Sequence, residues 1–63
     1  MKNSLGKFRK HKGLRQKDVA KYLGISERQY NRYEAGTADI PMSKLKMLSQ
    51  LYNVSIDALL DSD

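Results

Sequence analysis

The chain has 63 residues and carries 12 Lys or Arg against 7 Asp or Glu, a net charge of +5, so it forms at most one domain without room for a large active-site cleft. It contains no cysteine and one histidine, His11, which excludes disulfides, thiolate metal sites and a zinc site, and suits a reducing cytosol. No apolar run approaches the roughly 18 residues that cross a membrane, and no apolar segment follows the basic N-terminus, so we expect neither a membrane span nor a signal peptide.

Apolar residues recur at helical spacing throughout, which predicts an all-α fold of five short helices in a single domain, residues 1–63. Leu5 and Phe8 open the first helix, with Asn3 or Ser4 as its cap. Gly13 ends this helix, because glycine readily adopts the left-handed conformation that closes helices.

The second helix is expected over residues 16–23. Val19, Ala20 and Leu23 form one apolar stripe along it, and Gly24 stops it.

The third helix is expected over about residues 26–35. Ser26 and Gln29 fit a capping box, in which each side chain bonds the other residue's backbone amide. At about 100° per residue, Tyr30 and Tyr33 share one face, which we predict is buried. The opposite, outer face holds groups able to bond the hydrogen-bonding edges of another molecule: Glu27, Arg28, Asn31 and Arg32. The alternative is that these four are ordinary solvated residues of an amphipathic helix.

Pro41 stands where a fourth helix begins, and Asn53 ends it. The expected apolar face of this helix consists of Met42, Leu45, Leu48 and Tyr52. Ser55 caps a short fifth helix containing Ile56, Leu59 and Leu60, and the tail 61–63 is expected to fray.

Residues 16–35 thus form a helix, a tight turn and a second helix. Ala20 permits close approach of the two helices, and Gly24 keeps the turn free of a side chain. Val19, Leu23, Ile25 and Tyr30 supply the apolar contacts. This pattern predicts a helix-turn-helix, whose second helix enters the major groove of DNA.

With this pattern the sequence resembles the Xre/phage-repressor (lambda-repressor-like, Cro/repressor-type) family over about residues 5–60. The matching positions are Leu5, Phe8, Arg9; Gly13, Leu14, Gln16; Val19, Ala20, Leu23, Gly24, Ile25, Ser26; Tyr33, Glu34, Gly36; Leu45, Leu48; and Val54, Ser55, Ile56, Asp57, Leu59, Leu60. The resemblance implies a compact five-helix DNA-binding domain.

The resemblance also implies roles for single residues. Glu27, Arg28 and Arg32 stand where family members face bases. Gln16 would bond a backbone phosphate and brace the recognition helix, and Ser26 would lie near a phosphate. Arg9 and Glu34 match a pair that forms a salt bridge between the first and third helices; the alternative is two unrelated surface charges.

The sequence departs from the family pattern at the phosphate-binding positions. Arg15 replaces the usual Ser or Thr cap, which costs on the order of 1 kcal/mol but adds a charge for a phosphate. Ala35 cannot make the backbone contact of the usual Asn, and Thr37 offers only a hydroxyl where a basic residue is common. We therefore expect phosphate contacts from Arg15 and Lys17 and from the first helix, in addition to Gln16, Ser26 and the Thr37 hydroxyl.

Charge divides unevenly along the chain. Residues 1–36 hold ten basic and three acidic groups, a net charge of +7, whereas residues 37–63 hold two basic and four acidic groups, a net charge of −2. This polarity suits a polyanionic partner. The alternative is a solvated basic face that only confers solubility.

Together these features predict a sequence-specific double-stranded DNA-binding transcriptional regulator, a repressor, that binds a palindromic operator as a homodimer. The expected dimer contact comprises Ile56, Ala58 and Leu59 with the loop before Pro41, although Leu59 would alternatively complete the core. We expect a cytoplasmic, nucleoid-associated protein of bacterial or phage origin, with no cofactor, metal, small-molecule ligand or membrane partner.

The rival function is a small helical protein-interaction or antitoxin-like module. Its binding face should carry apolar anchors, whereas the predicted outer face is polar. An enzyme is not expected, because the chain has no grouping of nucleophile, histidine and carboxylate and no glycine-rich phosphate loop.

Overall fold

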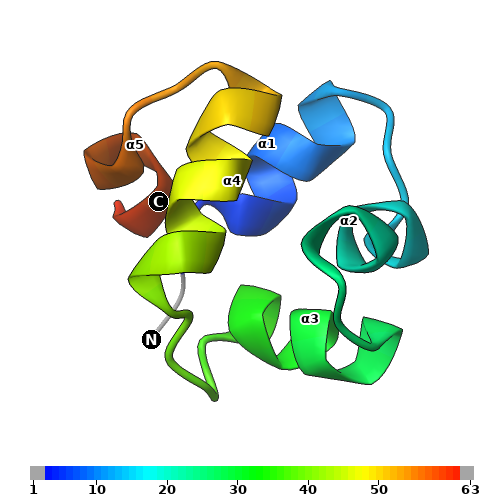
Figure 1. Cartoon of the computed structure of the whole chain (residues 1–63). Coiled ribbons are helices and arrows are strands. Elements are labelled where there is room, and N and C mark those ends of the chain that lie inside the picture. Colours follow the sequence, from blue (N-terminus) through cyan, green and yellow to red (C-terminus); the bar gives the residue numbers. More distant parts are fainter. Residues whose placement is uncertain (1–2, 62–63) are drawn as a thin grey trace.

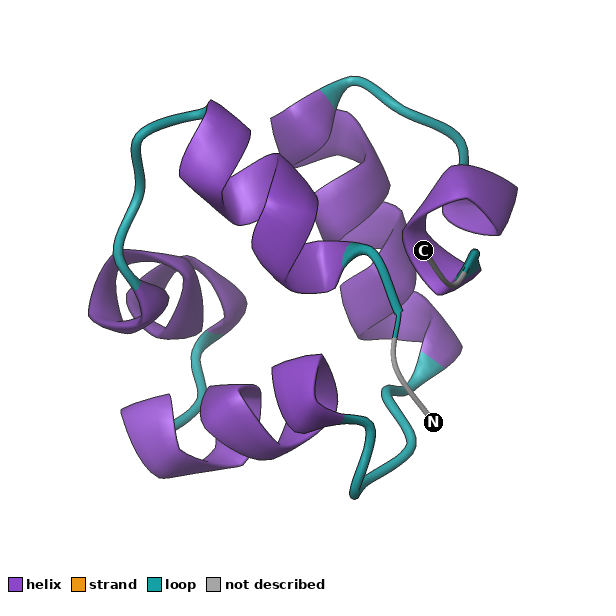
Figure 2. Cartoon of the chain, turned by 180° about the vertical axis from the view of Figure 1, so that it is seen from behind, coloured by secondary structure: helices purple, strands orange, loops and turns teal. Residues whose placement is uncertain are grey.

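The computed structural model describes residues 3–61, and all regular structure in that range is helical. The helices are α1 (Leu5–His11), α2 (Gln16–Leu23), α3 (Glu27–Ala35), α4 (Met42–Tyr52) and α5 (Ile56–Leu60). In Figure 1, α3 lies along the lower edge with α2 above its right end, and α1, α4 and α5 form the rest of the molecule. Figure 2 shows that loops alone join them. The predicted all-α, five-helix fold is confirmed.

The predicted helix ends follow from local conformations that only certain residues adopt easily. Gly24 and Gly36 have φ angles of 75° and 77°, in the left-handed region where a Cβ atom is unfavourable. Asn53 closes α4 in the same region, with φ of 55°. Each of these caps returns its backbone N–H to a carbonyl of the helix it ends, so the chain turns sharply there.

Side-chain caps explain where three helices begin. Ser26 Oγ accepts from the Gln29 amide at 3.1 Å, and Ser55 Oγ accepts from the Ala58 amide at 3.1 Å. Of the predicted capping box only this Ser26 half forms; the Gln29 side chain does not return a bond to Ser26. Position 15 lacks the usual Ser or Thr, but the start of α2 is still capped, because Asp18 Oδ2 accepts from the Arg15 amide at 2.9 Å.

The core lies where the five helices meet. Its buried members are Leu5, Val19, Ala20, Leu23, Tyr30, Tyr33, Leu45, Leu48, Tyr52 and Leu59. Met42 was expected on the apolar face of the fourth helix, but it lies on the first turn of α4 and is 55% exposed, so it is not part of the core. The two predicted core tyrosines of α3 are buried, which leaves the opposite side of that helix to solvent.

The two ends of the described chain are tied together. The Ser4 amide donates to the Leu59 carbonyl at 3.0 Å, and Ser4 Oγ donates to the Asp61 carbonyl at 2.6 Å. Fraying was expected from residue 61 onward, but Asp61 is held by this bond. Residues 62 and 63 lie outside the described residues.

Candidate nucleic-acid interface

The α2–turn–α3 unit is rigid because backbone and side chains both close it. Gly24 turns the chain out of α2, and the Ile25 amide bonds back to the Ala20 carbonyl at 3.0 Å. Ser26 then starts α3. Val19, Leu23 and Tyr30 are at most 2% exposed, so apolar packing fixes α3 against α2. This arrangement is the predicted helix-turn-helix.

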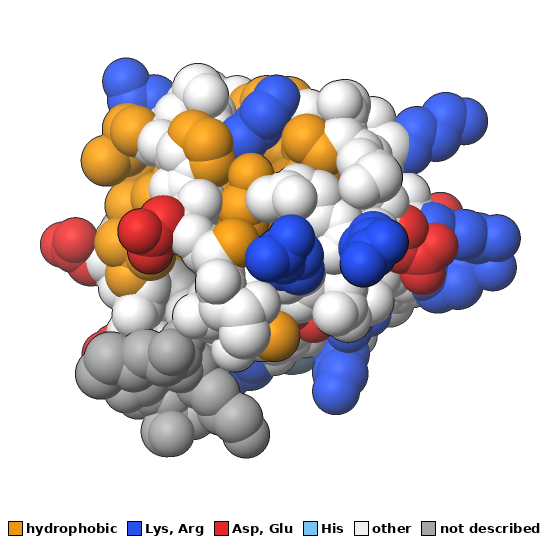
Figure 3. All heavy atoms as spheres, turned by 90° about the horizontal axis from the view of Figure 1, so that it is seen from below, with side chains coloured by type: hydrophobic (Ala, Val, Ile, Leu, Met, Phe, Trp, Pro, Cys, Tyr) orange, Lys and Arg blue, Asp and Glu red, His pale blue; other side chains and the backbone are white. Residues whose placement is uncertain are grey.

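The outer face of α3 consists of four exposed side chains: Glu27, Arg28, Asn31 and Arg32. Within residues 3–61, the side chains of Glu27, Arg28 and Arg32 make no hydrogen bond or ion pair. Figure 3 views the molecule from the side of α3; Lys and Arg side chains project from the middle and the right of this face, with acidic side chains at its edges. The strip is thus free to contact another molecule.

Asn31 differs from its three neighbours, because it is already bonded. Its Nδ2 donates to Gln16 Oε1 at 3.2 Å, and Gln16 Nε2 donates to Glu34 Oε1 at 3.2 Å. Gln16, at the first turn of α2, therefore contacts α3 at two points. The structure places it as a brace between the two helices, whereas its expected phosphate contact stays a prediction.

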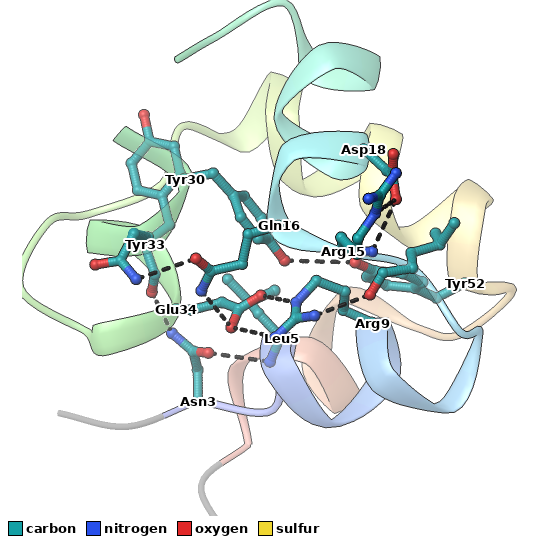
Figure 4. A network of polar contacts seen from close by, with 12 residues as sticks. Asn3, Leu5, Arg9, Arg15, Gln16, Asp18, Tyr30, Tyr33, Glu34 and Tyr52 are labelled. Atoms are coloured by element: carbon teal, nitrogen blue, oxygen red, sulfur yellow. Dashed lines mark hydrogen bonds and ion pairs between the residues drawn. The ribbon is translucent and has the colours of Figure 1, made fainter. Parts of the chain in front are cut away.

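Arg9 and Glu34 form an ion pair that joins α1 to α3. Arg9 Nε donates to Glu34 Oε2 and Arg9 Nη2 donates to Oε1 at 3.3 Å, with both side chains 11% exposed (Figure 4). Arg9 Nη1 donates to the Leu14 carbonyl at 2.9 Å. The reading of these two residues as unrelated surface charges is therefore wrong.

The ionisation of this cluster follows from its contacts. Burial raises the pKa of Glu34, but the hydrogen bonds from Arg9 and Gln16 and the charge of Arg9 outweigh burial, so the pKa lies below its ordinary value. The bond to Glu34 likewise raises the pKa of Arg9. Burial raises the pKa of Tyr30, whose hydroxyl lies 3.4 Å from that of Tyr52. At neutral pH Glu34 is thus a carboxylate that can only accept hydrogen bonds.

The residues expected to bind phosphates lie at the amino end of α2 and on either side of α3. Arg15, Lys17, Ser26 and Thr37 are exposed and Gln16 is half-buried. Arg15 Nε also contacts Asp18 Oδ2 at 3.3 Å. Thr37 Oγ1 donates its only hydrogen to the Arg32 carbonyl at 3.3 Å, so a phosphate contact from this hydroxyl would require that bond to break.

The expected dimer residues do not form one exposed patch. Leu59 is fully buried, so its assignment to a dimer surface is wrong and it completes the core instead. Ile56 and Ala58 are half-buried. Leu60, which the sequence did not assign to the dimer contact, is 49% exposed and so more exposed than Ile56, Ala58 or Leu59.

Two contacts around α3 and α2 escaped the sequence analysis. Asn3 Nδ2 donates to the Tyr33 carbonyl at 2.8 Å, and Lys44 Nζ donates to the Leu23 carbonyl at 2.7 Å. In both, a polar side chain bonds a carbonyl in the last turn of a distant helix, and no local sequence pattern predicts such a contact. An acid three residues after Arg15, in contrast, is a readable signal for the Asp18 cap.

Other kinds of site find no support in the described chain. Among residues 3–61, no three His, Asp or Glu side chains gather in a group that could hold a metal ion. Within the same residues, the structure has no helix of the length and apolarity that a membrane crossing requires.

Comparison with known proteins agrees with this geometry. A family model described as helix-turn-helix matches residues 5–59. The chain is 41% identical over 56 residues to the SPbeta prophage-derived uncharacterized HTH-type transcriptional regulator YonR of Bacillus subtilis (strain 168), covering 89% of the chain and 52% of that relative. It is 38% identical over 56 residues to the uncharacterized HTH-type transcriptional regulator YobD of the same organism, covering 89% and 50%.

The chain therefore spans about half the length of the curated relatives it matches. The match nonetheless includes all of α2 and α3 and nearly the whole described fold. The chain belongs to the Xre/lambda-repressor-like helix-turn-helix family of transcriptional regulators, as its sequence motifs predicted.

Proposed function

We propose that this chain is a sequence-specific double-stranded DNA-binding transcriptional regulator that inserts α3 into the major groove. The observation that carries the proposal is the exposed, polar outer face of α3, held by buried tyrosines on the opposite side. A helix fits the major groove, where each base pair presents a distinct pattern of donors, acceptors and methyl groups. The relatives are described as transcriptional regulators, which supports the same function.

Each outer residue has a base partner that suits its chemistry. The Arg28 guanidinium fork fits guanine O6 and N7, and Glu27 accepts from cytosine N4. Glu27 also repels misplaced phosphates, so it contributes by exclusion. Asn31 suits adenine, and Arg32, one turn beyond Arg28, reaches a base or a phosphate.

Phosphate contacts supply the affinity that does not depend on sequence. Arg15, Lys17, Gln16 and Ser26 flank the groove-facing helix, with Thr37 at its far end. Basic side chains release counterions from DNA when they bind, so affinity falls as salt rises. A single half-site offers few contacts, and we therefore propose a homodimer on a palindromic operator with half-sites about 34 Å apart.

Binding of this kind would block access to a promoter, so we propose that the protein acts as a cytoplasmic repressor without enzymatic activity. No cofactor or small-molecule ligand enters the proposal. A protein-interaction module of the antitoxin type is the competing function.

Selection of bound duplexes from a random pool tests the proposal. The expected result is a recurrent sequence whose affinity falls as salt rises. Replacement Arg28→Ala should relax preference at one base pair by about 1–3 kcal/mol and leave the other positions unchanged. Lys46→Ala, on the exposed side of α4, is the matched control and should keep the full profile. A pool without enrichment, together with tight capture of a protein partner, would favour the antitoxin-type reading.

A further inference from the structure

The side-chain amide of Asn31 is the last member of a hydrogen-bonded chain that begins in the protein interior. The chain runs from the Glu34 carboxylate through Gln16 to Asn31, with nitrogen-to-oxygen distances of 3.2 Å at both steps. Figure 4 shows the Gln16 side chain directed toward Glu34, which is bonded in turn to Arg9. Glu34 is 11% exposed, whereas Asn31 stands on the solvent-facing strip.

A carboxylate at one end gives this chain a direction. An ionised Glu34 has acceptor oxygens and no hydrogen, so the Gln16 amide must turn its NH₂ group toward it. The Gln16 oxygen then faces Asn31, and the Asn31 amide must in turn direct its NH₂ group inward. The reverse order would set the Gln16 oxygen against a carboxylate oxygen, and two acceptors repel each other.

The direction decides what Asn31 can offer to DNA. One Asn31 N–H donates to Gln16, which leaves Asn31 Oδ1 as an acceptor and the second N–H as a donor. We propose that Glu34, although buried and remote from DNA, acts through Gln16 as a positioning residue that makes Asn31 present this acceptor–donor edge, and so selects adenine. The inference rests on the proposed function, because it concerns how α3 reads a base.

Adenine matches the edge because it presents an N6 amino donor beside the N7 acceptor in the major groove. Guanine presents two acceptors, O6 and N7, and thymine presents O4 beside a methyl group, so both oppose the Asn31 oxygen. An Asn31 amide with the opposite orientation would present its NH₂ group and suit guanine. Loss of the carboxylate at position 34 would therefore permit both orientations and broaden the preference.

Selection of duplexes from a random pool tests this inference with four variants. Asn31→Ala identifies the base pair that Asn31 reads, because preference is lost there. Glu34→Gln removes the carboxylate that can only accept hydrogen bonds. Gln16→Leu interrupts the hydrogen-bonded series between Glu34 and Asn31 but keeps the Arg9–Glu34 ion pair. Gln50→Leu, on the exposed side of α4, is the matched control. All selections are run at a temperature where thermal unfolding shows each variant to be folded.

The wild-type protein should prefer adenine over guanine and thymine at the position that Asn31→Ala identifies, by about 5-fold to 100-fold. This preference should fall below about 3-fold in Glu34→Gln and in Gln16→Leu. The position relaxed by Arg28→Ala should keep its preference in both variants. These values follow from the usual free energy of one base contact. A general loss of affinity from a weakened fold or a lost phosphate contact would instead lower binding to all sequences alike.

Four results would overturn the inference: an unchanged preference in both chain variants, a uniform loss at all positions, a wild-type preference for guanine, thymine or cytosine, or no position sensitive to Asn31→Ala. In all four the recovered sequence still supports the proposed function. A wild-type chain that enriches no sequence at all overturns the proposed function itself, and this inference with it.

Discussion

At the scale of single residues, Glu34 is the point on which polar contacts from α1 and α2 converge. It accepts from Arg9 and from Gln16, and its carboxylate has little access to water. A charge in such a position is stabilising only while its partners are present, since an unpaired buried charge is costly.

Replacement Glu34→Gln should lower the free energy of unfolding by about 3 kcal/mol, because it leaves the largely covered Arg9 guanidinium, 11% exposed, without a counter-charge. Urea denaturation at pH 7 measures the change. Glu27→Gln is the matched control: Glu27 is exposed and unpaired among the described residues, so its loss should leave stability unchanged. Equal midpoints for both variants would show that the ion pair contributes nothing.

Gly6 lies against the same carboxylate. A Cβ atom at this position would come within 2.9 Å of Glu34 Oε1 and 3.4 Å of Glu34 Cδ. Alanine normally stabilises a helix interior by about 1 kcal/mol relative to glycine. Because Arg9 and Gln16 hold the carboxylate in place, we expect Gly6→Ala to destabilise the protein instead.

The same Gly6→Ala change in a Glu34→Ala background should stabilise the protein, since the obstructing carboxylate is then absent. Thermal unfolding of the two pairs measures this reversal of sign. Stabilisation by Gly6→Ala in both backgrounds would contradict the close contact between α1 and Glu34.

At the scale of the helices, α2 is held at its carboxyl end by a residue of α4. Lys44 Nζ donates to the Leu23 carbonyl at 2.7 Å, a favourable place for a positive charge because the last turn of a helix carries partial negative charge. This bond links the helix-turn-helix to α4 at the turn that precedes α3.

Lys44→Met should keep most of the apolar stem and lose this charged hydrogen bond, lowering the free energy of unfolding by about 1.5 kcal/mol. Chemical denaturation checks the value. Lys46→Met, on the exposed side of the same helix, should change stability by less than about 0.5 kcal/mol. A similar loss in both variants would point to a general effect of charge rather than to the Leu23 contact.

The helices themselves could be predicted because their ends are encoded locally. Gly24, Gly36 and Asn53 stop helices through their own backbone preferences, and Ser26 and Ser55 start them through bonds to amides three residues on. The spacing of Tyr30 and Tyr33 was sufficient to assign the two faces of α3, because the buried face of a short helix follows from its apolar residues.

The remaining features depend on contacts between distant segments. Asn31 bonds Gln16 across 15 residues and Lys44 bonds Leu23 across 21, and neither spacing is a recurring pattern. Leu59 was open to two readings, because five residues of α5 do not reveal how much of the helix the other elements cover. The Ser4 amide donates to the Leu59 carbonyl, and the Leu59 side chain lies in the core.

At the scale of the whole molecule, the Glu34 cluster links stability to pH. The pKa of Glu34 is lower in the folded chain than its unfolded value of about 4.3. Between these two values the unfolded chain binds more protons than the folded chain, so stability falls as pH drops through that range. The contribution is fully present above the unfolded pKa.

Urea midpoints measured from pH 7 to pH 2.5 should therefore decline below about pH 4.5, where carboxylates begin to bind protons in the unfolded chain. The Glu34→Gln variant should decline less steeply over the same range, because it lacks the group with the lowered pKa. Parallel curves for the two proteins would show that Glu34 is not a source of the acid sensitivity.

The net charge of the whole molecule is distributed unevenly along the chain. The +7 charge of residues 1–36 accompanies the helix-turn-helix, whereas residues 37–63 are slightly acidic. This polarity would orient the chain toward DNA before specific contacts form, since long-range fields steer association.

The central claim is that the outer face of α3, and no other surface, contacts the bases of double-stranded DNA. Two-dimensional ¹H–¹⁵N NMR spectra of the chain, recorded as the selected duplex is added, test it most directly. The largest shifts should fall on residues 26–37 and 15–17, including the side-chain amide of Asn31, and Arg28→Ala should weaken them. Shifts centred on α4 and α5, with residues 26–37 unmoved in the presence of bound duplex, would contradict it.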